Sequence, residues 1–128
     1  MRQLQAFHQR FGAHMEQAPT ADIPAAVGEV RAHLIAEELA EYRAAFAAGD
    51  LVEIADALTD LLYLVLGTYH SHGLQDIAAE LFDEVHRSNM TKLGANGQPV
   101  LREDGKVLKS ELYSPPDLRA IVKGATAT

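Results

Sequence analysis

The chain has 128 residues, of which 48% are hydrophobic, and it contains no cysteine. This composition predicts one domain with a hydrophobic core, and it excludes disulfides, thiolate catalysis and Cys-ligated metal sites. The N-terminus has no apolar run of signal-peptide length, and no apolar run elsewhere could span a bilayer. We therefore expect a cytoplasmic protein with no membrane partner.

The net charge of −7 is divided unequally along the chain. Residues 1–86 carry 14 acidic and 4 basic side chains, whereas residues 87–128 carry 4 acidic and 7 basic ones. An acidic body argues against a polymeric nucleic acid partner, but an acidic cluster beside a basic tail suits a metal-bridged polyanion such as a nucleotide phosphate. The alternative is a solvated acidic surface with an ordinary basic end.

Apolar residues at helical spacing predict a body of four helices over residues 3–91. The first covers residues 3–15 and ends near Gly12 or Met15, and His8 and His14 are expected to be helix-surface or groove residues without a catalytic role. The second is expected to begin with Asp22 as its cap and Pro24 in its first turn, and to stop at Gly49. Arg31 on this helix has two open interpretations, a phosphate contact or a surface ion pair.

The third predicted helix begins at Asp50 and ends near Gly73, and the fourth covers residues 74–90 with Ile77, Leu81, Phe82 and Val85 facing inward. In residues 51–66 all but four side chains are apolar, so we expect the third helix to be buried nearly all round. A lone four-helix body cannot cover such a helix. The sequence therefore predicts a homo-oligomer, at least a dimer, with residues 61–66 near the interface.

Residues 92–128 form a basic tail that is rich in turn signals. Asp104-Gly105 between two apolar segments predicts a small β-hairpin. Ser114-Pro115-Pro116 is expected to cap a last helical turn. The predicted fold is thus all-α, a four-helix bundle-like body with a short irregular or hairpin tail, in a single domain of residues 1–128.

Carboxylates interrupt the apolar pattern of the second and third helices and fall on one flank of each. Six side chains share this pattern: Glu37, Glu38, Glu41, Glu53, Asp56 and Asp60. Like charges four residues apart destabilise a helix by a few tenths of a kcal/mol per pair. Arg43 is the single Lys or Arg between Leu34 and Glu80, so we interpret the missing cation as a metal ion.

A helix cap and a di-iron site are the competing roles for these carboxylates. Glu53 follows Asp50 at the spacing of a capping box, so it could serve only as a helix cap. Capping does not account for Asp56 and Asp60, because an unpaired buried carboxylate costs several kcal/mol. A di-iron site requires Glu-x-x-His on two helices, and no His follows a Glu by three here. Oxygen ligands of this kind favour Mg²⁺ or Mn²⁺.

The motif EELAE at residues 37–41 followed by EIAD at 53–56 resembles the EExxE and ExxD signature of the MazG-like all-α nucleoside triphosphate pyrophosphohydrolases. The segments FDEVHRSNMTKLG and GKVLKSELYSPPDL resemble the tail of the branch related to phosphoribosyl-ATP pyrophosphohydrolase. The resemblance covers most of residues 7–118.

This resemblance implies hydrolysis of a nucleoside or deoxynucleoside triphosphate between its α and β phosphates, as house-cleaning of the nucleotide pool. The sequence does not specify the base, and we take dUTP as the first substrate to test. The resemblance also implies metal ligands at Glu38, Glu41, Glu53 and Asp56, with Asp60 as an additional or outer ligand, and Glu37 as the base that activates water. The phosphate or sugar contacts implied by motif position are Asn89, Lys92, Lys109 and Tyr113. The competing interpretation is a non-catalytic helical dimerisation or cation-binding module.

Overall fold

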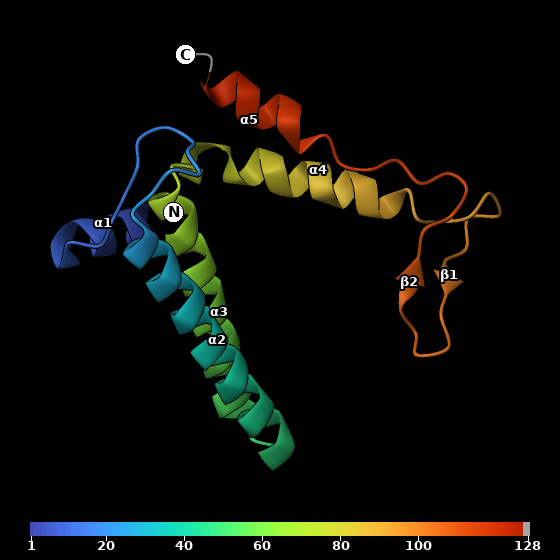
Figure 1. Ribbon diagram of the computed structural model, residues 1–128. Coiled ribbons are helices and arrows are strands. Elements are labelled where there is room, and N and C mark those ends of the chain that lie inside the picture. Colours follow the sequence, from blue (N-terminus) through green and yellow to red (C-terminus); the bar gives the residue numbers. More distant parts are fainter. Residues whose placement is uncertain (127–128) are drawn as a thin grey trace. The chain divides into compact units, whose positions relative to one another are not determined.

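The computed structural model describes residues 1–126, which are mostly helical with a two-stranded antiparallel sheet near the C-terminal end (Figure 1). The helices are α1 (Arg2–Phe11), α2 (Ala25–Ala48), α3 (Leu51–Ser71), a short 3₁₀ helix (Gln75–Ile77), α4 (Ala78–Met90) and α5 (Leu118–Thr126). The strands are β1 (Val100–Leu101) and β2 (Val107–Leu108). The predicted all-α class and the hairpin are confirmed.

The chain divides into two compact units, Met1–Asp76 and a second unit that begins at Ile77, and each is described by itself. The first unit holds three of the predicted helices, whereas α4 belongs to the second. A four-helix bundle and a single domain therefore remain predictions. No helix within residues 1–126 is both long and apolar enough to cross a bilayer.

In the first unit α2 and α3 run side by side and antiparallel (Figure 1). Gly49 ends α2 in the left-handed conformation, at φ 67°, and Asp50 begins α3, so two residues reverse the chain. The side chains of Ala45 and Ala57 are buried. Small residues at these positions let the two helices approach closely, which holds their acidic flanks near one another.

Helix α1 packs against α3 and is held by buried polar side chains. His8 is only 2% exposed, and its Nδ1–H donates to the backbone carbonyl of His14 at 3.2 Å. The Nε2–H of His70, also buried, donates to the carbonyl of Met1 at 3.2 Å. Of the two positions expected for His8, helix surface or groove, the structure shows the enclosed one, because its ring lies between the loop that follows α1 and α3.

Two expectations about α2 and α3 are wrong. Asp22 does not cap α2, because the chain stays extended at Pro24 and the helix begins at Ala25. Helix α3 is not buried all round, since Leu58, Leu62 and Val65 are exposed. These three side chains follow one another at helical spacing, so they form one apolar stripe.

The second unit contains α4, the hairpin and α5, which packs against α4. Leu81 is buried as expected, but Phe82 is 72% exposed and Val85 is also exposed, so the predicted inward face of α4 is only partly correct. The hairpin pairs Val100 with Leu108 and Leu101 with Val107.

The last helix differs from the sequence expectation in length and in its cap. Helix α5 has nine residues rather than a single turn. Asp117 caps it, accepting from the Ala120 N–H at 3.1 Å, and the Ser-Pro-Pro segment lies before this cap. Residues 1–126 thus contain five α-helices where four and a turn were expected.

Candidate metal centre

Glu38 is the most enclosed carboxylate of the acidic cluster. Its side chain is half-buried, and its Oε2 is shielded from solvent without a hydrogen-bond partner among residues 1–126. A buried carboxylate oxygen normally has a partner, because leaving one unpaired costs free energy. Such an orphaned oxygen is free to bind a metal ion.

The surroundings of Glu38 raise the pKa of its carboxyl group above the usual value. Burial is the largest cause, followed by a hydrogen bond with Glu41 and by the negative charges of Glu41, Asp60 and Asp56. Carboxylates from α2 and α3 are therefore close enough to act on one another electrostatically. The predicted ligands Glu38, Glu41, Asp56 and Asp60 lie together in the structure.

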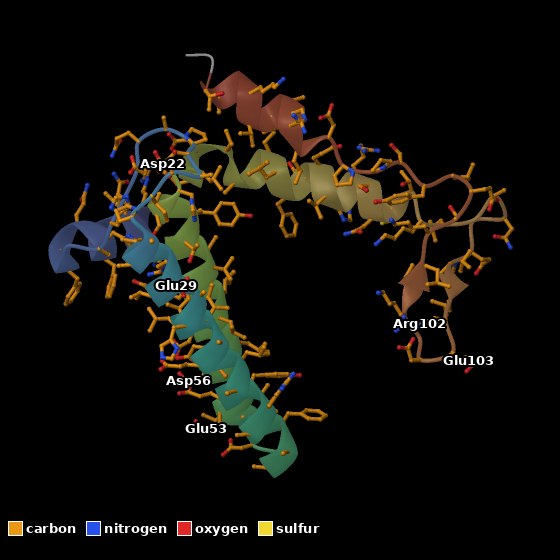
Figure 2. The ribbon with its side chains drawn as sticks, viewed as in Figure 1. Asp22, Glu29, Glu53, Asp56, Arg102 and Glu103 are labelled. Carbon is orange, nitrogen blue, oxygen red and sulfur yellow. The ribbon has the colours of Figure 1, made fainter. Side chains whose placement is uncertain are left out.

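Glu53 joins this cluster through a cavity of about 400 Å³ that it lines together with Glu41. Asp56 follows Glu53 by three residues on α3, so both lie on one flank of this helix, and Figure 2 labels both toward the end of the helix pair that holds the connection between α2 and α3. Glu41 from α2 and Glu53 from α3 thus line the same cavity.

Glu53 does not complete a capping box at the start of α3. Asp50 is the N-cap of this helix, and its Oδ1 accepts from the N–H groups of Val52 and Glu53, both at 3.1 Å. In a capping box the Glu53 side chain would bond the Asp50 N–H in return, but that N–H donates to the carbonyl of Ala45 at 3.1 Å. The carboxylate of Glu53 is therefore free for another role.

Glu37 lies differently from the other carboxylates. Its Oε1 pairs with Nε2 of His33 at 2.9 Å, and both side chains are exposed. Glu37 is absent from the charges that raise the pKa of Glu38. It is thus directed to solvent beside the cluster rather than into it.

No Lys, Arg or His within residues 1–126 forms an ion pair with the five clustered carboxylates. Equally, no group of three or more His, Asp or Glu side chains among these residues is placed so that it could hold a metal ion. Like charges repel, and the negative charges of Glu41, Asp56 and Asp60 act on Glu38. The donor set, carboxylate oxygens with one of them orphaned, fits a hard divalent ion.

The predicted substrate residues lie in the second unit. Asn89 lies in the last turn of α4, and its carbonyl accepts from the Lys92 N–H at 3.1 Å. The ammonium of Lys109 lies 4.8 Å from the centre of the Tyr113 ring. The hydroxyl of Ser110 donates to the carbonyls of Thr91 and Leu93, at 3.0 and 2.8 Å. This brings the segments of Lys92 and Lys109 together within the unit.

Sequence reasoning missed the role of Arg31. Its Nε–H donates to Oγ1 of Thr68 at 3.0 Å and an Nη2–H donates to the carbonyl of Leu64 at 2.7 Å, so it bridges α2 to α3. Burial lowers the pKa of its guanidinium. A surface ion pair is therefore wrong, since no acid within residues 1–126 pairs with it. The available signal was a lone cation in the apolar stripe of α2, seven residues before Glu38.

Residues 4–89 match the family of phosphoribosyl-ATP pyrophosphohydrolases, and the chain belongs to this family. The MazG-like resemblance is thereby confirmed, and membership supports a hydrolase of pyrophosphate bonds. The chain is also 30% identical to a candidate NTP pyrophosphohydrolase from Exiguobacterium sp. 255-15, known as a crystal structure. The match covers 98% of this chain and 92% of that one, with a TM-score of 0.47. No curated protein matches the chain significantly.

Proposed function

We propose that this protein hydrolyses a nucleoside or deoxynucleoside triphosphate between its α and β phosphates, with Mg²⁺ or Mn²⁺ as cofactor. Water adds across the anhydride, one P–O bond breaks, and a monophosphate and pyrophosphate are released. The observation that carries the proposal is the orphaned, buried oxygen of Glu38 among acids of two helices that no cation of residues 1–126 neutralises. Family membership supports the same class of reaction.

In this proposal Glu38, Glu41, Glu53 and Asp56 hold the divalent ion, and Asp60 is an additional or outer ligand. The bound ion would supply neutralisation of the polyphosphate and orientation of a water. Glu37 is the proposed base. Its exposure beside the cluster supports this role, because the carboxylate can reach solvent water without being a ligand itself.

The basic tail is proposed to bind the substrate. Lys92 and Lys109 would attract the triphosphate, while Asn89 and Tyr113 would contact phosphate or sugar. The proximity of the Lys92 and Lys109 segments within the second unit supports a shared role. We further propose dUTP as the first substrate to test, action in the cytoplasm, and a homo-oligomer whose contact includes the exposed stripe of α3.

The decisive experiment measures pyrophosphate release from a panel of NTPs and dNTPs with Mg²⁺, with Mn²⁺ and with EDTA. Activity should require the metal. Glu38→Gln should lower kcat roughly a hundredfold or more, because it removes a charged ligand from the centre. The ion should also raise the melting temperature of the wild type by a few degrees, since it binds only the folded state.

Glu29→Gln is the matched control. Glu29 lies on the same helix as Glu38 and is exposed. It is near the start of α2, and Figure 2 shows it away from Glu53 and Asp56. This variant should keep both activity and metal stabilisation. Equal activity in EDTA would overturn the metal proposal, and no pyrophosphate from any nucleotide would favour a non-catalytic cation-binding module.

A further inference from the structure

A second cavity of about 300 Å³ lies in the first unit near the start of α2. Its walls include Ala13, Ala26, Val27 and Val30, and its polar groups come from His14, Arg31 and Ser71. Mostly apolar cavities with a few polar groups are typical binding sites, and this volume is at the small end of their range. It could hold a heteroaromatic ring but not a complete nucleoside triphosphate.

Arg31 is the main polar group available to a ligand in this cavity. A guanidinium has five N–H donors, and Thr68 and Leu64 accept two of those of Arg31. The other two polar side chains each have one partner already: Nε2 of His14 bonds Oε1 of Glu16 at 2.8 Å, and the Ser71 hydroxyl donates to the carbonyl of Gly67 at 3.3 Å. A ligand would therefore meet hydrogen-bond donors between apolar walls.

The cavity lies in line with the candidate metal centre. Arg31 precedes Glu38 by seven residues, which places both on the same face of α2 and about 10 Å apart along the helix axis. On α3, Leu64 contacts Arg31 and follows Asp60 by four residues. This spacing is roughly that between the base of a nucleotide and its α and β phosphates.

We propose, resting on the function proposed above, that this cavity binds the base of the substrate and that Arg31 selects bases with a keto rather than an amino group at C4 of a pyrimidine or C6 of a purine: uracil, thymine and guanine. The fixed donors of Arg31 match O4 of uracil or thymine, or O6 and N7 of guanine. They would face the amino group of cytosine or adenine, which is itself a donor. The apolar walls favour a flat ring over a hydrated phosphate.

The first test is the ratio of kcat/KM between keto-base and amino-base triphosphates, measured with Mg²⁺. The wild type should prefer dUTP over dCTP, and dGTP over dATP, by about tenfold or more. Arg31→Lys keeps the charge but loses the planar guanidinium, so the ratio of kcat/KM between keto-base and amino-base triphosphates should fall toward one. An equal or reversed preference in the wild type, or an unchanged ratio in folded Arg31→Lys, would overturn the assignment.

Ala26→Phe fills the cavity without removing a bond of Arg31, so it tests the site even if Arg31→Lys does not fold. It should abolish calorimetric binding of dUMP by metal-free protein, whereas Ala47→Phe, at an exposed position of α2 outside the cavity, should not. Undiminished dUMP binding by Ala26→Phe would refute the cavity.

The binding experiment also separates this inference from the proposed function. If the wild type binds dUMP but not dCMP and yet releases no pyrophosphate from any nucleotide, the base site stands and the hydrolysis proposal fails. If it hydrolyses all dNTPs equally, hydrolysis stands and base selection by Arg31 fails.

Discussion

Gly67 shows how one residue can support a whole site. A Cβ built at this helical position would lie 2.6 Å from Nη2 of Arg31 and 2.9 Å from Nε2 of His8. Both neighbours are held, Arg31 by its bonds to α3 and His8 by its bond to His14. The absence of a side chain at Gly67 thus leaves room for the guanidinium that bridges the two helices.

Gly67→Ala should therefore lower the free energy of unfolding by about 1–3 kcal/mol, because the added methyl group overpacks a buried contact. The measurement is urea unfolding followed by circular dichroism. Gly28→Ala on α2 is the control: a Cβ there meets nothing within 4 Å, so its better helix propensity should stabilise the protein by about 0.5–1 kcal/mol. If the two substitutions changed the free energy of unfolding equally, the absence of a side chain at Gly67 would not be needed to make room for Arg31.

At the level of elements, the packing of α1 on α3 requires a neutral His8. Burial and nearby positive charge both disfavour protonation of this side chain. The pKa of His8 is lowered by burial first, and further by the charges of Arg31 and His70, while the hydrogen bond to His14 acts in the opposite direction. The rings of His8 and His70 lie with centroids 5.7 Å apart. A proton on His8 would therefore weaken the packing of α1 on α3.

The sign of the resulting pH dependence follows from the depressed pKa. The unfolded chain takes up a proton on His8 near its ordinary pKa of about 6.5, while the folded chain resists until lower pH. The contribution of neutral His8 is thus present above about pH 6.5 and is lost as the pH falls through the folded value.

We expect the melting temperature of the wild type to drop between about pH 7.5 and 5.5 by a few degrees more than that of His8→Gln, which cannot titrate. Differential scanning calorimetry at low metal concentration would measure both. Parallel curves for the two proteins would contradict a depressed pKa at His8.

At the scale of the whole molecule, the exposed apolar stripe of α3 in the first unit bears on assembly. The stripe consists of Leu58, Leu62 and Val65, whose side chains are all exposed. Contiguous apolar surface of this kind typically marks an interface. The observed stripe includes part of the segment 61–66 that the sequence predicted for subunit contact.

Leu62→Glu should therefore shift the assembly from a dimer or larger oligomer toward monomer in light scattering at micromolar concentration. Leu112→Glu is a matched control, since Leu112 is 56% exposed and Leu62 is 59% exposed, but Leu112 lies in the tail. It should leave the mass unchanged. A monomeric wild type would contradict the prediction that the stripe forms a contact between subunits.

Much of this protein could be predicted from local signals. Helical spacing of apolar residues, the stop at Gly49, the cap at Asp50 and the turn at Asp104-Gly105 each depend on a few neighbouring residues, and all were found where expected. The pairing of the two acidic helices also followed from the sequence, because a two-residue connection forces them to lie antiparallel.

Other features depend on contacts between distant residues, which the sequence alone does not display. The bonds of Arg31 to α3 span 33 and 37 residues, and the enclosure of His8 requires α1, its following loop and α3 together. A pattern of apolar residues could not show which face of α3 remains exposed, because that depends on where α1 and α2 pack. The sequence by itself determined the helices and their acidic flanks, whereas only the tertiary structure decided that Glu38 is orphaned, that Glu37 faces solvent and that Arg31 lines a cavity.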